Sequence, residues 1–284
     1  MVARVLPAAR RRGKAQPAVR TCAAGPGTPI SAHCRAEDAS IKPILLLLAI
    51  VLAPIVWSAG AVLANSRPHW SQTRWDSTGL APEPASHPDA VVQVYAARTW
   101  GWKGAVAVHS WISLKKAGAA GYERYDVVGW GVRNGGGAIR RNLRPADARW
   151  AGNDPQLILD LRGEAAAAAI PKIEAAIAAY PHDDSYVTWP GPNSNTFVAY
   201  VLRAVPELNA ELPSTAIGKD FLPNGQLAGM APSGTGVQLS LGGLLGVTLA
   251  RDEGVELNIL GLVFGVDPLD LAIKLPGVGR IGLR

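Results

Sequence analysis

The chain has 284 residues, of which 48% are hydrophobic and 18% charged, and its formal net charge is +6. This composition excludes a disordered protein, a coiled coil and a small disulfide-rich scaffold. The positive surplus lies entirely in residues 1–42, whereas residues 43–284 contain as many acidic as basic side chains. A nucleic-acid-binding protein normally carries its positive field on the folded domain, so the pattern argues against nucleic acid as a partner.

A charge-free apolar segment follows this basic tail. Residues 43–64 are long enough to cross the hydrocarbon core of a bilayer as one helix, and they predict a single transmembrane helix. The positive-inside rule then places residues 1–42 in the cytoplasm and the rest of the chain beyond the membrane. A cleaved secretory signal is the alternative, but a 42-residue lead is too long for its basic region unless the start codon is assigned too far upstream.

Both cysteines, Cys22 and Cys34, lie in the basic tail. A disulfide is not expected in a reducing compartment, and their spacing fits no zinc pattern. The rest of the chain can have neither an internal disulfide nor a cysteine nucleophile. We predict no metal site and no cofactor.

The sequence then predicts a linker and an α+β domain. Residues 65–90 are rich in proline, serine and threonine, as is typical of a linker. Within the domain, residues 91–232, strand patterns occur at 91–95, 104–114, 122–130 and 156–161. The alternation in 104–114 places His109 and Trp111 on one face, and the short polar connection to 122–130 predicts a hairpin.

Two helical segments and a β-rich end complete the pattern. Residues 164–180 are alanine-rich, and Pro171 is expected to begin a second helix there. A second apolar stripe follows Asn193 or Ser194, either of which can serve as its N-cap. The glycine-rich residues 233–284 predict a β-meander packed on the domain, with attachment to the membrane surface as the alternative.

One pair of residues could carry chemistry. Ser194 stands at the start of a helix, where backbone amides and the helix dipole favour developing negative charge. His109 could act as its general base, and Asp126 is the candidate to orient the imidazole. A binding groove is predicted around Trp111, Trp130, Trp189, Asn193 and Asn195. As structural alternatives, His109 could be an ordinary core residue and Ser194 a simple helix cap.

The order of these residues is that of a known group of hydrolases. Residues 193–197, Asn-Ser-Asn-Thr-Phe, resemble the Asn-Cys-Asn-x-Phe segment of the PPPDE peptidases, which are circularly permuted papain-like enzymes, and the upstream His109 also matches their order. The resemblance implies a permuted papain-like domain with an antiparallel sheet. Ser194 replaces their cysteine, so either the site has become a serine hydrolase or catalysis is lost and the groove is kept.

A longer stretch resembles an uncharacterised bacterial membrane-protein family, domain of unknown function 3750. The resemblance implies a protein of the bacterial inner membrane with a periplasmic main domain, and it brings no established activity. The matching segments are residues 108–111, 125–131, 189–197, 212–220 and 236–246.

Three functions therefore stay open. The first is a single-pass envelope protein with a degenerate or serine-converted papain-like groove. The second is a serine-type amide or ester hydrolase of the envelope, and the third is a structural or ligand-binding membrane protein without catalysis. The expected partners are membrane lipid and an envelope peptide or glycan.

Overall fold

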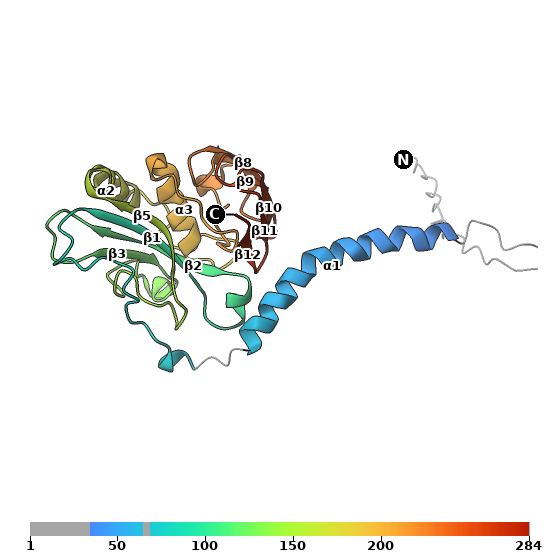
Figure 1. Ribbon diagram of the computed structural model, residues 1–284, viewed down its shortest axis with the longest axis horizontal. Helices are drawn as coiled ribbons and strands as arrows, with labels where there is room; N and C mark the ends of the chain where they lie inside the picture. Colours follow the sequence, from blue (N-terminus) through green and yellow to red (C-terminus); the bar gives the residue numbers. More distant parts are fainter. Residues whose placement is uncertain (1–34, 65–68, 284) are drawn as a thin grey trace, which may run out of the picture. The chain divides into compact units, whose positions relative to one another are not determined.

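The computed structural model describes residues 35–64 and 69–283 (Figure 1). Residues 1–34 of the predicted tail lie outside the described residues. Cys22 and Cys34 are among them, so the prediction that they form neither a disulfide nor a zinc site is not tested. The chain divides into two compact units, residues 1–47 and 48–284.

The apolar segment forms helix α1, Arg35–Ala64, which begins earlier than predicted. No helix in the described part of the chain is both long enough and apolar enough to cross a membrane. The transmembrane prediction for residues 43–64 is therefore not supported. Near the end of α1 the Ser58 side chain is buried, with its hydroxyl 2.5 Å from the carbonyl oxygen of Ala105 and 3.0 Å from that of Gly277.

A five-stranded antiparallel sheet forms the centre of the α+β domain. Its order is β4-β3-β2-β1-β5. The predicted hairpin is confirmed, because β2 and β3 pair with Ile112 opposite Tyr125. The strands are β1 (Val91–Arg98), β2 (Val108–Lys115), β3 (Glu123–Val127), β4 (Ile139–Arg141) and β5 (Gln156–Arg162).

Helices α2 (Gly163–Ala178) and α3 (Ser194–Ala204) pack on one face of this sheet (Figure 1). Pro171 lies inside α2, so the prediction that it begins a second helix is wrong. Proline costs a helical hydrogen bond. Here Ile170 and Ile173, on either side of it, are both buried in the core, and this packing holds the helix continuous across the proline.

The other face of the sheet is covered by aromatic side chains. Tyr95, Trp111 and Trp150 form a second core cluster, and Trp70 and Trp75 from the predicted linker pack against it. Because both faces are covered, β1 and β2 are buried along almost their whole length. The segment around Trp70 and Trp75 is thus part of the domain rather than a free linker.

The glycine-rich end forms the predicted β-meander. It is a seven-stranded antiparallel sheet in the order β12-β11-β10-β9-β8-β7-β6, and it starts before residue 233, the predicted boundary. Figure 1 shows this sheet beside α3. Its strands are β6 (Ala228–Met230), β7 (Gly236–Leu241), β8 (Leu245–Ala250), β9 (Gly254–Ile259), β10 (Leu262–Asp267), β11 (Ala272–Leu275) and β12 (Gly279–Ile281).

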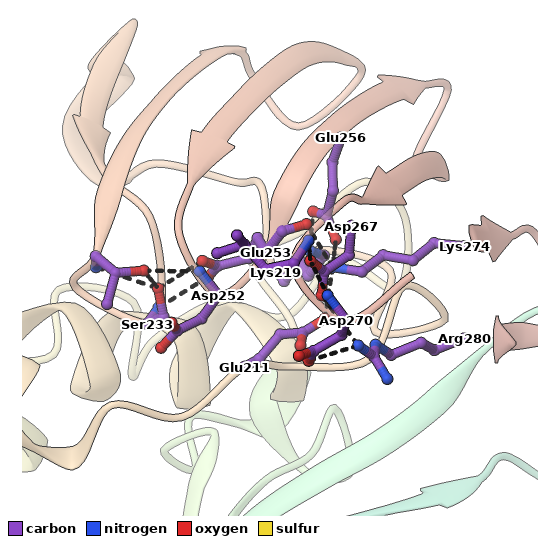
Figure 2. A network of polar contacts seen from close by, with 12 residues as sticks. Glu211, Lys219, Ser233, Asp252, Glu253, Glu256, Asp267, Asp270, Lys274 and Arg280 are labelled. Atoms are coloured by element: carbon purple, nitrogen blue, oxygen red, sulfur yellow. Dashed lines mark hydrogen bonds and ion pairs between the residues drawn. The ribbon is translucent and has the colours of Figure 1, made fainter. Parts of the chain in front are cut away.

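The inner side of the meander holds a buried network of charges (Figure 2). Glu256 forms ion pairs with Lys219 and with Lys274, whose Nζ lies 2.8 Å from Glu256 Oε1 and 2.5 Å from Glu211 Oε1. Burial opposes the ionisation of Glu256, but the two ammonium groups outweigh it and hold its pKa below the ordinary value. Glu256 is therefore ionised between the two ammonium groups.

Candidate functional site

His109 lies on β2 and faces the aromatic side of the sheet. Its ring stacks on Trp150, with centroids 3.5 Å apart and planes 14° from parallel, and its more distant neighbour is Trp111. The side chain is almost fully buried. The alternation of β2 thus places His109 and Trp111 on the same face, as the sequence predicts.

Asp126 orients the imidazole from the neighbouring strand. Its Oδ1 lies 2.9 Å from His109 Nε2. The carboxylate is held in turn by Arg124, whose Nε and Nη2 donate to its two oxygens at 2.7 and 2.8 Å. Arg124 also stacks over Trp111 at 4.0 Å. The β2–β3 register therefore brings Asp126 and Arg124 to the face that carries His109.

The charges of this group follow from its surroundings. Burial opposes ionisation of Asp126, but Arg124 and the hydrogen bond from His109 outweigh it, so the pKa of Asp126 lies below its ordinary value. Burial lowers the pKa of His109, against the opposing effect of Asp126. The imidazole is thus neutral at pH 7. An ionised carboxylate can only accept, so the proton sits on Nε2 and leaves Nδ1 as an unprotonated base.

The N-terminus of α3 is capped by Asn193 rather than by Ser194. Asn193 Oδ1 accepts from the amides of Asn195 and Thr196 at 2.9 and 3.2 Å, and the Thr196 hydroxyl accepts from the Asn193 amide, which completes a capping box. Among the described residues, the Ser194 hydroxyl is used in no hydrogen bond. The structure does not need Ser194 as a cap.

Asn195 fastens this helix end to β2. Its Nδ2 donates to the carbonyls of Val108 at 3.0 Å and Ile217 at 2.8 Å, and its Oδ1 accepts from Ser110. Asn195 therefore has a structural role, and it holds Ser194 beside the strand that carries His109.

His109 and Ser194 line the same cavity, which has a volume of about 910 Å³. Asn193, Asn195, Trp130 and Trp189 line it as well, and the two tryptophans are about half exposed. Within the described residues, no hydrogen bond joins the Ser194 hydroxyl directly to the His109 ring. Two predicted site residues do not line the cavity: Asp126 lies behind His109, and Trp111 is fully buried, with Nε1 donating to the carbonyl of Ala146 at 2.8 Å.

Several site residues were missed from the sequence. Arg124 was detectable, because it alternates with Asp126 on a predicted strand. The cavity walls also include Trp70, Trp100, Trp102 and Trp150, which come from irregular segments or short helices without a strand pattern. Over the described ranges, no cluster of three or more His, Cys, Asp or Glu side chains could hold a metal ion.

Fold and site together describe an α+β domain with an aromatic cavity around a buried histidine, aspartate and arginine. Residues 89–221 match the model of a family described as Protein of unknown function (DUF3750). No curated protein and no solved structure matches the chain. The matched residues contain the five-stranded sheet and helices α2 and α3, and the family description states no activity.

Proposed function

We propose that the cavity binds a substrate with an amide or ester bond and that Ser194 attacks its carbonyl with His109 as general base. One observation carries this proposal: His109 commits Nε2 to Asp126, and it shares the cavity with a serine hydroxyl that has no structural partner. The order of these residues and the antiparallel sheet support a permuted papain-like fold, which is part of the same proposal.

The chemistry would be acyl transfer. The Ser194 hydroxyl adds to the carbonyl carbon while its proton moves to His109 Nδ1, and the protonated imidazole then gives that proton to the leaving amine or alcohol. Water hydrolyses the resulting ester of Ser194 by the reverse sequence. Asp126 positions the imidazole and stabilises its charged form.

The oxyanion donors differ from those expected at a helix N-terminus. The amides of Asn195 and Thr196 already bond the Asn193 side chain. This leaves the amide of Ser194 itself as the candidate donor to a developing oxyanion.

A serine-directed fluorophosphonate probe tests the proposal. Labelling of the full chain should be lost in Ser194→Ala and reduced at least about 100-fold in His109→Gln. Ser86→Ala, in the loop before β1, is the matched control and should label like the wild type. Labelling that survives Ser194→Ala would contradict the assignment of the nucleophile.

Binding without catalysis is the second candidate. It is favoured by the two half-exposed tryptophans at the cavity and by the lack of a direct bond between Ser194 and His109. In this case a peptide or glycan would quench tryptophan fluorescence, Trp130→Ala would weaken its binding, and Ser194→Ala would leave affinity unchanged with no probe labelling.

We also propose that the domain acts beyond the inner membrane of a bacterium. The basic tail before an apolar segment supports this location. Alkaline phosphatase fused after residue 90 or after residue 284 should be active. Inactive fusions at both positions would place the domain in the cytoplasm.

A further inference from the structure

The outer face of the seven-stranded sheet is a continuous aliphatic surface. Along β7, β8 and β9 every outward position is leucine, isoleucine or valine, and the register joins these positions into rows. One row runs Met230, Val237, Leu249, Val255, Val266, Ile273 and Ile281, and a parallel row contains Leu239, Val247 and Leu257. We call this surface the outer aliphatic face.

Its side chains are open to the surroundings. Their exposed fractions run from 39% for Val247 to 61% for Leu241. Together they expose on the order of 1,000 Å² of apolar surface, whereas monomeric soluble proteins rarely leave more than a few hundred in one patch.

The polarity of this sheet is the reverse of that expected in water. An antiparallel sheet with one solvated face normally turns its apolar side chains inward and its polar side chains outward. Here Gln238, Thr248, Glu256 and Lys274 point inward, where they are buried in the polar network that includes the charges of Figure 2. This alternation of polar and apolar residues is thus the one expected for a sheet whose outer face contacts an apolar environment.

The chemistry of the face identifies its occupant. A protein partner normally meets a mixture of apolar and polar groups, with about one hydrogen bond per 100–200 Å². The outward side chains of β7 to β10 offer no hydrogen-bonding group. A second copy of this aliphatic face would find no polar group to fix one orientation. The hydrocarbon of a lipid bilayer requires neither hydrogen-bonding groups nor one fixed orientation. Binding to a bilayer surface becomes stronger as more apolar area is buried.

We propose that the outer aliphatic face docks on a lipid bilayer, with its side chains in contact with acyl chains. This docking is independent of Ser194 and His109. It is also distinct from a transmembrane helix, because it needs only the outward side chains of a folded sheet.

A site-specific fluorophore tests the docking in the full chain. With Cys22→Ser and Cys34→Ser as background, Leu257→Cys places an environment-sensitive label at the centre of the face. Ala165→Cys, on the exposed surface of α2, is the matched control. Vesicles of phosphatidylcholine with phosphatidylglycerol should shift the emission of the label at 257 to the blue and leave the label at 165 unchanged.

A paired substitution separates this face from other apolar surfaces of the chain. Val247 and Leu257 are directly opposed in the β8–β9 register, so Val247→Glu with Leu257→Lys adds two charges that attract each other. With a label at Leu239→Cys, this variant should lose the vesicle-induced blue shift. The same charges at Ala165→Glu and Ala168→Lys on α2 are the control and should leave the shift intact.

Three results would overturn the proposal. They are a label at 257 that does not respond to vesicles, a shift that survives the paired substitution, and a shift that follows protein concentration without lipid. The last result would assign the face to a second copy of the chain. Circular dichroism and thermal melting of each variant check that it remains folded.

Discussion

Replacing Asp126 with asparagine tests the network that positions His109. The substitution keeps the size of the side chain but removes its charge, and the Arg124 guanidinium, which is 1% exposed, loses its counter-ion. The new amide group would also place N–H donors against the donors of Arg124. Breaking a buried ion pair from one side costs about 3–5 kcal/mol. For a domain of this size we expect the melting temperature to fall by roughly 6–20 °C.

The pH dependence of stability gives a second measurement. The folded-state pKa of Asp126 is lowered, so its contribution is present above its ordinary value of about 3.9 and is lost as the pH falls through the folded-state value. Asp126→Asn should therefore flatten the acid end of the stability profile. The folded-state pKa of His109 is also lowered, so the unfolded chain binds more protons there and stability rises with pH up to about 6.5. This rise should persist in Asp126→Asn.

The assay is urea denaturation followed by circular dichroism between about pH 3 and pH 8. Asp154→Asn is the matched control, because this carboxylate is 74% exposed beside Arg149 and its loss should cost at most about 1 kcal/mol. Adding Arg124→Met to Asp126→Asn removes the unpaired charge and should restore part of the stability. Equal stability of Asp126→Asn and the wild type at pH 7 would refute the role of the network.

Three further predictions concern stability. Ser194→Ala should stay within about 0.5 kcal/mol of the wild type in urea denaturation, whereas Asn193→Ala should cost about 2 kcal/mol because it removes the cap; equal losses would contradict the capping assignment. Gly218→Ala would place a Cβ 2.4 Å from Asn193 Nδ2 at φ +101° and should melt several degrees lower than Gly225→Ala, whose Cβ meets nothing within 4 Å. Glu256→Gln leaves two buried ammonium groups with less counter-charge and should cost about 3–5 kcal/mol by thermal or urea unfolding; a cost below about 1 kcal/mol would show that the network is dispensable.

Much of the secondary structure could be predicted from local patterns. The alternation of β2, the turn before β3 and the polar residues before α3 are short-range signals, and each element forms. β2 begins at Val108 rather than at the predicted residue 104, because Gly101–Ala105 form a short 3-10 helix. The local pattern around Pro171 predicts a helix start, whereas α2 continues through this residue. The packing of Ile170 and Ile173 on the sheet, a tertiary contact, keeps the helix continuous.

The site was only partly predictable, for a different reason. A one-residue change in register would turn Asp126 to the opposite face, and the loop between β2 and β3 hides the register from the sequence. Trp111 and Trp130 look alike as isolated aromatic residues. Only the covering of the second sheet face by Trp70, Trp75 and Trp150 decides that one is core and the other lines the cavity.

The buried network connects the two sides of residue 221, where the family match ends. Lys219 and Asp220, just before that limit, find partners in the next sheet: Lys219 pairs with Glu256, and Asp220 accepts from Gln238 and Asn258. The Trp189 side chain likewise donates to the carbonyl of Leu260. Removing the meander would therefore take away the partners of Lys219, Asp220 and Trp189. We expect the stretch 89–221 to be less stable alone than with the meander, because Lys219 and Asp220 would exchange buried partners for water and the apolar groups around them would be exposed.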